Sequence, residues 1–340
     1  MNLAAHSRGF HGLLLALVLA SCATPRALEQ EEHIQLDPLM GDWEGHRVAS
    51  SGIVVPVLAQ VIALGDSTYN AMLQEEFGKP NPGSLPLDFR FDGESILFPG
   101  VPAMTAHLTD NLIVGTSSGD EAVSFRLRRI VRLSPTLGAK APPGATVLFD
   151  GRSLDEWTRV GEPAGAPGWK LVGGDAMEVV VGSGSIMTKK SFRDFHLHLE
   201  FRTPFMPTAR GQARGNSGVY LQGRYEVQVL DSYGLTGEDN ECGGIYKVSK
   251  PLLNMCAPPG QWQTYDVTFQ ATRFDASGAK IRDARVTVLH NGVAIHQYVT
   301  IPGPTGGALD ANEQMPGPLY LQDHGNPVQY RNIWLTETTH

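Results

Sequence analysis

The sequence predicts an all-β protein in which a two-sheet β-sandwich follows a smaller antiparallel β domain. The 340 residues include 38 glycines and 23 prolines without a G-X-Y period, a composition typical of turn-rich β proteins rather than collagen. Short alternating runs of apolar and polar residues recur along the chain and are separated by glycine, proline or aspartate. We find no internal repeat of about 20–50 residues, which argues against solenoids and propellers.

Composition and charge limit the classes of function. Hydrophobic residues make up 41% and charged residues 18% of the chain, which is typical of a folded protein. The 27 basic and 35 acidic residues give a net charge of −8, and no basic stripe is long enough to neutralise a row of phosphates. We therefore do not expect a nucleic-acid partner.

The N-terminal residues 1–21 are predicted to be a lipoprotein signal peptide. The apolar run 13–20 is about eight residues long, far below the ~20 needed to span a bilayer. Residues 19–22 resemble the bacterial lipobox, so Cys22 is predicted to be lipidated; the alternative is an ordinary signal peptide with an incidental cysteine. Residues 22–35 are polar and are interpreted as a tether. Ala23 after the cysteine favours an exported protein anchored in the outer membrane and facing the periplasm.

The two remaining cysteines are predicted to form a disulfide. Lipidation of Cys22 leaves Cys242 and Cys256, an even pair in an oxidising compartment. Two free thiols or half of a metal site are the alternatives, and the chain has no C-x-x-C motif.

Residues 36–133 are predicted to form an accessory β domain. Strand-like runs divided by turns at intervals of about ten residues are typical of an antiparallel meander or a small barrel. The polar residues within 42–46 are interpreted as a strand start rather than a site. Residues 134–146, rich in proline, glycine and alanine, are the strongest linker signal in the chain.

Residues 147–340 are predicted to form the sandwich. Residues 196–202 alternate strictly, so Leu197, Leu199 and Phe201 should point into a core while the polar residues share the other face. The run 225–229 alternates in the same way. About a dozen such runs suit two packed sheets with one face open to solvent.

Seven ordered motifs in this region resemble a known family. They lie at 148–157, 215–220, 225–231, 244–246, 260–262, 321–325 and 331–333. Together they are similar to the 3-keto-disaccharide hydrolase domain, formerly a domain of unknown function, over about residues 147–337. The resemblance implies a concanavalin-like jelly-roll β-sandwich and a carbohydrate substrate, a glycoside whose sugar carries a ketone at C3.

Such a substrate needs few catalytic groups. A ketone at C3 acidifies the hydrogen on C2, so a base can remove it and the enolate can expel the C1 oxygen; water then adds, giving net hydrolysis. One base, one oxyanion stabiliser and one acid for the leaving group suffice. The sequence requires no cofactor, and a divalent metal stays open as a further enolate stabiliser.

The carboxylates Glu226 and Asp231 are the first catalytic candidates. Glu226 shares a strand face with Gln228, whereas Asp231 has the opposite parity unless a bulge turns it. The E-x-Q-x-x-D spacing resembles the E-x-D-x-x-E strand of sandwich-fold glucanases, but Gln228 replaces the middle carboxylate, which argues against their mechanism. We expect Glu226 to act as base or acid and Asp231 to orient it or bind metal. Alternatively, Glu226 binds sugar hydroxyls or pairs with Arg214 or Arg202.

His324 is the third catalytic candidate. It stands next to Gly325 at a predicted strand end, where an exposed imidazole could shuttle protons near neutral pH. Gln322 shares its parity, so both could face one ligand. Alternatively, His324 makes only a structural hydrogen bond. Arg331 could bind the keto oxygen, or it could simply pair with a carboxylate such as Asp323.

The set His196, His198 and Glu200 could supply three metal ligands from one strand. Alternate strand residues are about 7 Å apart, however, so a solvated or sugar-binding face is the favoured interpretation. Glu200 and Arg202 match the E-x-R strand end of the family.

The predicted substrate-binding residues offer hydrogen-bonding groups to sugar hydroxyls or an aromatic platform to a sugar ring. They are Glu200, Arg202, Arg214, Asn216, Gln228, Tyr246, Trp262, Gln322 and Arg331. Tyr220 is a further platform candidate and Ser217 a further polar one; core packing and turn chemistry are the alternatives. A non-catalytic lectin and an ordinary glycosidase with paired carboxylates remain the rival functions.

Overall fold

The computed structural model describes residues 37–80, 86–99, 101, 104–119, 122–162 and 165–338. The predicted signal peptide, the lipidation site Cys22 and the tether lie outside these residues. The described chain contains 24 strands and one short 3-10 helix, η1 (Gly211–Ala213), and every named strand pair is antiparallel. The predicted all-β class is confirmed. No helix among the described residues has the length and apolar character that a membrane crossing needs.

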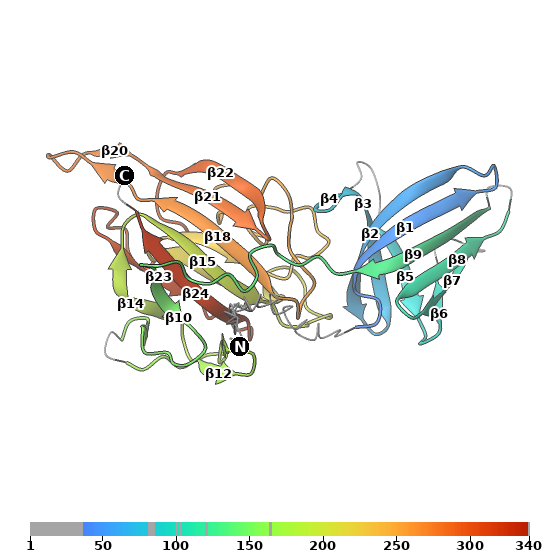
Figure 1. Cartoon of the computed structure of the whole chain (residues 1–340), viewed down its shortest axis with the longest axis horizontal. Helices are drawn as coiled ribbons and strands as arrows, with labels where there is room; N and C mark the ends of the chain where they lie inside the picture. The colour runs from blue at the N-terminus through green and yellow to red at the C-terminus, as the bar shows by residue number, and fades with distance from the viewer. Residues whose placement is uncertain are drawn as a thin grey trace, which may run out of the picture. The chain divides into compact units, whose positions relative to one another are not determined.

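The first nine strands form one sheet that closes on itself. Its order is β2-β1-β9-β8-β7-β6-β5-β3-β4, and an additional β2–β3 pairing joins β1–β3 and β5–β9 into a ring of eight strands (Figure 1). Trp43 and Tyr69 fill its interior, and the Tyr69 ring stacks on Phe89 at 5.2 Å. The predicted meander or small barrel is therefore confirmed. The strands are β1 (Gly41–Ala49), β2 (Val54–Gly65), β3 (Thr68–Glu76), β4 (Lys79–Pro80), β5 (Leu87–Phe91), β6 (Ser95–Leu97), β7 (Met104–Thr109), β8 (Leu112–Ser117) and β9 (Val123–Ile130).

The remaining strands form an eight-stranded sheet, a five-stranded sheet and a two-stranded hairpin. The eight-stranded sheet contains β10 (Thr146–Phe149), β12 (Lys170–Val172), β13 (Ala176–Glu178), β15 (Phe195–Arg202), β18 (Gln263–Gln270), β21 (Ala284–His290), β22 (Val293–Ile301) and β24 (Gln329–Glu337). The five-stranded sheet contains β11 (Trp157–Arg159), β14 (Ile186–Phe192), β16 (Ser217–Leu221), β17 (Tyr225–Val229) and β23 (Gly317–Leu321). The hairpin pairs β19 (Arg273–Phe274) with β20 (Lys280–Arg282).

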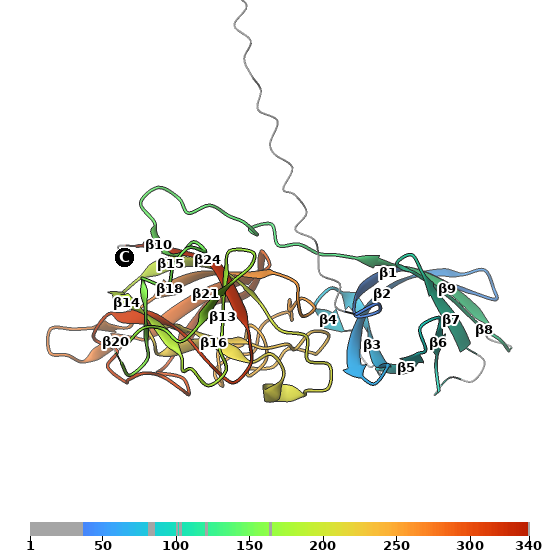
Figure 2. The ribbon, with the colours of Figure 1, turned by 90° about the horizontal axis from the view of Figure 1, so that it is seen from below.

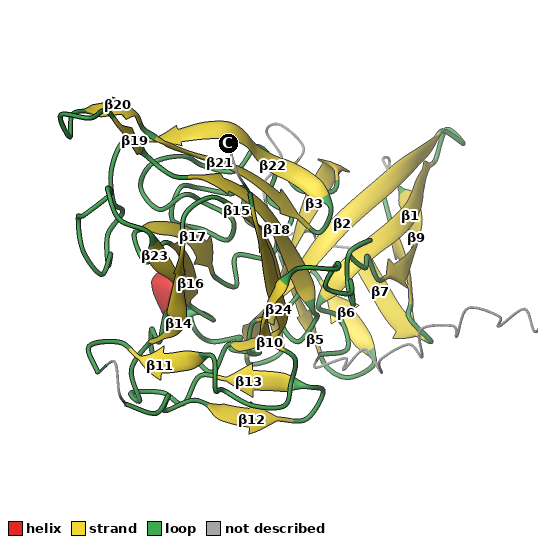
Figure 3. Ribbon diagram, turned by 60° about the vertical axis from the view of Figure 1, so that its left-hand side comes forward, coloured by secondary structure: helices red, strands yellow, loops and turns green. Residues whose placement is uncertain are grey.

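The eight-stranded and five-stranded sheets form separate layers (Figure 3). Buried side chains join the two layers. The Tyr265 hydroxyl of β18 donates to the Gln228 carbonyl of β17 at 2.7 Å, and the Tyr330 hydroxyl of β24 donates to Ser217 of β16 at 2.7 Å. Leu197, Leu199 and Phe201 of β15 are buried in this core, as their alternation predicts. On β17 the side chains of Tyr225, Val227 and Val229 alternate with those of Glu226 and Gln228. Glu226 and Gln228 therefore lie on the face of the sheet that points away from this core.

Cys242 and Cys256, the predicted disulfide pair, are buried thiols whose side chains contact each other. Both are free in this structure, and the bridge stays a prediction. Each also lies near a second partner: Cys242 Sγ is 3.3 Å from the Tyr265 hydroxyl and Cys256 Sγ is 3.4 Å from the Leu230 carbonyl. Backbone pairing holds the segment after Cys242 as well, since Gln228 of β17 accepts from Gly243 and donates to Gly244, both at 2.9 Å.

Candidate functional site

A group of polar and aromatic side chains gathers on the outer face of the five-stranded sheet. Cross-strand pairing places Tyr220 of β16 opposite Glu226 of β17 on one side and Tyr320 of β23 on the other. The two tyrosine rings stack at 4.4 Å. Gln228 lies two residues beyond Glu226 on the same face, and Gln322 directly follows β23. We call these five residues the Glu226 face.

Glu226 is the buried carboxyl of this face. The residue is 3% exposed, and no basic group among the described residues contributes to its pKa. Burial raises its pKa to about 8, and the neighbouring Tyr220 hydroxyl only partly opposes that rise. Gly218 makes room for the carboxyl, because a Cβ there would clash with Glu226 Oε1. A carboxyl with this pKa can both take and give a proton near neutral pH.

Two amide oxygens on the Glu226 face are buried without a hydrogen-bond partner among the described residues: Gln228 Oε1 and Gln322 Oε1. The amide nitrogens are engaged. Gln228 Nε2 lies 3.2 Å from Gln212 Oε1 and 3.3 Å from Asn216 Oδ1, and Gln322 Nε2 donates to the Tyr220 hydroxyl at 3.3 Å. A buried acceptor without a donor is costly, so both oxygens suit the hydroxyl groups of a ligand.

The segment around Gly306 borders the Glu226 face. The Tyr220 hydroxyl donates to the Gly306 carbonyl at 2.9 Å, and the Glu226 backbone N–H donates to Thr305 Oγ1 at 3.0 Å. A Cβ on Gly306 would lie 3.4 Å from the Tyr246 ring. The predicted platform residue Tyr246 is thereby placed at the edge of this face.

The predicted residue Asn216 also lies beside the Glu226 face. Its side-chain amide donates to the Gln212 carbonyl at 2.8 Å, and its backbone N–H donates to Asn326 Oδ1 at 2.7 Å. Asn216 therefore holds η1 next to Gln228, whose amide it contacts. Asn216 therefore both stabilises a turn and lies beside the Glu226 face.

Asp231 and Arg214 form a buried ion pair of their own. Arg214 Nε lies 2.6 Å from Asp231 Oδ2. Burial raises the pKa of Asp231, whereas Arg214 lowers it. Among the described residues no contact joins Asp231 to Glu226, so the predicted orienting role has no support in the geometry. Arg214 is likewise the partner of Asp231 and does not pair with Glu226.

His324 lies in the exposed turn that follows β23, two residues beyond Gln322. The preceding Asp323 accepts from the backbone N–H groups of Gly182 and Gly184 at 2.9 and 3.1 Å. These bonds fix the turn that presents the imidazole to solvent. The alternative pairing of Asp323 with Arg331 does not occur, because Arg331 contacts Glu200.

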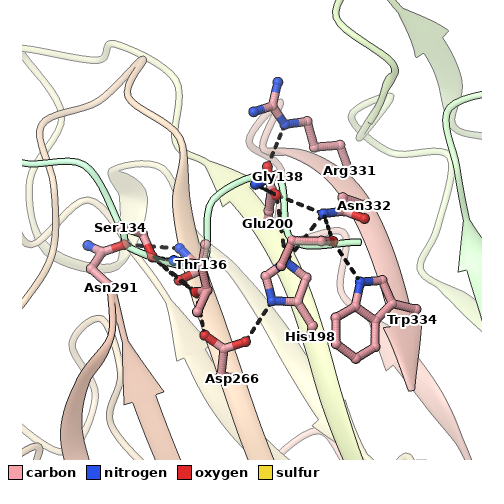
Figure 4. Close-up of polar contacts among 12 residues, drawn as sticks. Ser134, Thr136, Gly138, His198, Glu200, Asp266, Asn291, Arg331, Asn332 and Trp334 are labelled. Carbon is pink, nitrogen blue, oxygen red and sulfur yellow. Dashed lines mark hydrogen bonds and ion pairs between the residues drawn. The ribbon is translucent and has the colours of Figure 1, made fainter. Parts of the chain in front are cut away.

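A second polar cluster lies on the eight-stranded sheet and is centred on Glu200 (Figure 4). The Glu200 carboxylate accepts from Arg331 Nε at 2.7 Å and from Asn332 Nδ2 at 2.8 Å. His198 Nε2 lies 3.6 Å from Glu200, and its Nδ1 lies 2.6 Å from Asp266. Burial would raise the pKa of Glu200, but the hydrogen bonds from His198, Asn332 and Arg331 and the Arg331 charge lower it to about 2.

The linker covers this second cluster. The Gly138 N–H donates to Glu200 Oε1 at 2.6 Å, and Thr136 Oγ1 donates to Asp266 Oδ2 at 2.6 Å (Figure 4). The Ala139 carbonyl accepts from Asn332 and also from Trp334. The sheet face that the alternation predicts to be open is therefore buried here by residues 134–139.

The predicted substrate-binding residues thus divide between two sheets. Trp262 lies under two guanidinium groups, with Arg331 at 4.1 Å and Arg202 at 4.7 Å from its ring centroid. Both arginines belong to the eight-stranded sheet, as does Glu200. Asn216, Gln228, Tyr246 and Gln322 accompany Glu226 instead. Among the described residues no group of three ligand-type side chains could hold a metal ion, so His196, His198 and Glu200 do not form a metal site.

The sequence reasoning missed Tyr320 and Gln212. Tyr320 shares strand parity with Gln322, so the alternation that marked Gln322 could have placed this ring on the same face. Gln212 lies in η1 and touches Gln228 only through a turn, for which the sequence carries no comparable pattern.

The Glu226 face and the second polar cluster both lie in the region that a family model matches. The family model of the 3-keto-alpha-glucoside-1,2-lyase-like domain matches residues 144–336. A structure from Parabacteroides distasonis ATCC 8503 named a "putative glycosyl hydrolase" is 41% identical, with a TM-score of 0.54 over 58% of this chain and 85% of that chain. A second structure of that name from the same organism is 21% identical, with a TM-score of 0.41 over 58% of this chain and 94% of its own. No curated protein matches the chain.

Proposed function

The chain belongs to the 3-keto-α-glucoside-1,2-lyase-like family, and from this premise we propose that it cleaves 3-keto-glycosides, with Glu226 as the proton-transferring group. The observation that carries the proposal is the buried Glu226 carboxyl, which has a pKa of about 8 and shares its sheet face with two amide oxygens that have no partner among the described residues. Its similarity to a glycosyl hydrolase structure supports an enzyme that acts on glycosides. We propose that the eight-stranded and five-stranded sheets together form a concanavalin-like jelly roll.

The proposed reaction begins with the ionised Glu226 carboxylate, which removes the proton from C2. The electron pair moves toward the C3 oxygen and then expels the C1 oxygen, breaking the glycosidic bond; addition of water to the resulting double bond completes net hydrolysis. A carboxylate with a raised pKa is a stronger base for this weakly acidic hydrogen. We assign protonation of the leaving oxygen to His324.

Tyr220 is the candidate for stabilising the developing oxyanion. Burial and the neighbouring Glu226 raise the pKa of its hydroxyl, so the phenol keeps its proton. To serve the oxyanion, this single O–H must turn away from the Gly306 carbonyl to which it donates. Gln228 and Gln322 would accept hydrogen bonds from sugar hydroxyls through their free oxygens. Paired-carboxylate hydrolysis is less well supported, because Asp231 is committed to Arg214 and no second carboxylate contacts Glu226 among the described residues.

A direct substrate comparison tests the proposed function. We expect the full chain to cleave a 3-keto-glycoside and to leave the matched unoxidised glycoside intact, since only the ketone acidifies C2. Chromatography measures the amount of product formed from each sugar, with and without a chelator. Equal turnover of both sugars would reject elimination, and binding of the 3-keto sugar without turnover would favour a lectin. Loss of turnover with chelator would place a divalent cation at the enolate.

We also propose that the protein is exported and anchored through acylated Cys22, on the sequence evidence of residues 1–22. The Cys22→Ala variant should lose incorporation of a radiolabelled fatty acid and should leave the membrane fraction, because the thiol is the acylation site. The Ser21→Ala variant keeps a small residue before the cysteine and should retain the label. Labelling of Cys22→Ala at the wild-type level would reject the anchor.

A further inference from the structure

The ring of strands β1–β9 carries a depression that lies outside the region matched by the family model. Its volume is about 510 Å³, and its lining comes from four strands, β1, β2, β8 and β9. These strands are consecutive neighbours in the sheet, in the order β2-β1-β9-β8 (Figure 2). A volume of this size is within the range of small-molecule sites.

The depression faces the outside of the ring. Trp43 of β1 and Leu127 of β9 are buried inside, at 0% and 9% exposure, so their strand neighbours point the other way. Glu44 lies opposite Arg128, and cross-strand pairing likewise brings His46 opposite Arg126. The depression is therefore bordered by three basic side chains and one carboxylate.

The carboxylate is already neutralised. Glu44 Oε1 accepts a hydrogen bond from Arg128 Nε at 3.1 Å. Arg126, in contrast, is exposed, and within the described part of the chain its guanidinium has no hydrogen-bond or ion-pair partner. The next arginines of the same segment are occupied, since Arg129 donates to main-chain carbonyls and Arg132 pairs with Asp42 at 2.9 Å. Arg126 thus supplies an uncompensated positive charge to the depression.

The remaining lining is apolar. Pro56 and Leu58 of β2 and Leu112 of β8 contribute to it, and Leu112 pairs directly with Arg128. Apolar side chains pack favourably against the C–H groups of a saturated ring, while a guanidinium binds a carboxylate through two parallel hydrogen bonds. The site therefore combines a surface for a ring with a cation for an acid group.

We propose that this depression binds a carboxylate-bearing saccharide, with the acid group on Arg126 and the sugar ring over Pro56, Leu58 and Leu112. The assignment rests on the ring of strands alone and does not depend on the chemistry proposed at Glu226. It gives the first β region a binding role toward acidic glycans.

Titration calorimetry on the full chain with glucuronate tests this site. We expect glucuronate to bind at least about 10-fold more tightly than glucose, which has the same ring without the carboxylate. Arg126→Ala should reduce glucuronate binding to the level of glucose, whereas Arg126→Lys should retain part of it. Arg90→Ala is the matched control, because Arg90 is an exposed arginine on β5 of the same sheet, and it should bind like wild type.

Three results would overturn the proposal: no glucuronate binding to wild type, equal binding of glucose and glucuronate, or unchanged binding in Arg126→Ala. Acetate and inorganic phosphate separate the charge from the ring. If either displaces glucuronate with equal affinity, the site is a simple anion site and the saccharide assignment is wrong. Turnover of a 3-keto-glycoside should be the same in Arg126→Ala as in wild type, so failure of one proposal is distinguishable from failure of the other.

Discussion

The Glu226→Gln variant is expected to lose between about 10²- and 10⁴-fold in kcat/KM toward a 3-keto-glycoside, the range typical of removing a general base. Glutamine keeps the size and hydrogen-bonding shape of the side chain but cannot take a proton from C2. The Glu156→Gln variant is a suitable control, because Glu156 is exposed and lies outside the Glu226 face. Activity of Glu226→Gln within about threefold of wild type would exclude Glu226 as the base.

The pH dependence of the wild type should report the same group. Since the base must be ionised, kcat/KM should rise with pH through an apparent pKa of about 8. The proposed acid His324 must be protonated, so it adds a limb that falls with pH, and this limb should be lost in His324→Ala. A rate that falls with pH through about 8, in place of the rise, would instead assign Glu226 the role of general acid. Initial rates between pH 5 and 10 distinguish the two profiles.

Stability should change in the opposite direction to activity. Burial raises the pKa of Glu226 from 4.5 in the unfolded chain to about 8, so the folded state holds a proton that the unfolded state releases between these values. The free energy of unfolding therefore falls as pH rises through this window. Above pH 8 the variant Glu226→Gln should be more stable than wild type by roughly 3–5 kcal/mol. Urea denaturation at pH 5 and pH 9 measures the difference, and equal pH dependence in both proteins would contradict the raised pKa.

Alternation in sequence was sufficient to predict the parts of the fold that depend on neighbours along one strand. Leu197, Leu199 and Phe201 pack inward, and Glu226 shares the outer face with Gln228. Strand parity is local information, because a residue's side follows from its position along the pleat. The environment of Glu226 also required Gly218 and Tyr220 from the adjacent strand, which the register supplies.

The segment that covers a strand face cannot be predicted from the alternation along that strand, because it comes from elsewhere in the chain. The pattern in 196–202 predicts a polar face but not that the linker lies on it, and the contact between Gly138 and Glu200 joins residues 62 positions apart. For the same reason the sequence could not show that Arg331 pairs with Glu200 rather than Asp323. The cysteine count predicted a disulfide between Cys242 and Cys256, and the fold brings these two side chains into contact, although both are free thiols in this structure.

The Glu200→Gln variant should be strongly destabilised, by about 3–5 kcal/mol at pH 7. Glu200 is 0% exposed and neutralises Arg331, whose guanidinium donates to it at 2.7 Å. Removing the carboxylate charge replaces the ion pair with Arg331 by a hydrogen bond to a neutral amide, and it weakens the bonds that the Gly138 N–H and Asn332 donate to Glu200. Urea denaturation gives the change in free energy, and amide exchange at Gly138 should become faster.

The pH dependence provides an independent test of this cluster. The pKa of Glu200 is lowered from 4.5 to about 2, so its stabilising contribution is complete above pH 4.5 and is lost as pH falls toward 2. Wild type should therefore lose roughly 3 kcal/mol more than Glu200→Gln over that window. The control is Glu337→Gln. Glu337 lies on β24 with Arg331 and forms a surface ion pair with Lys190, so its loss should cost less than about 1 kcal/mol of unfolding free energy. If Glu200→Gln is as stable as Glu337→Gln, the linker is held by contacts other than this carboxylate, and the covered face would be dispensable for folding.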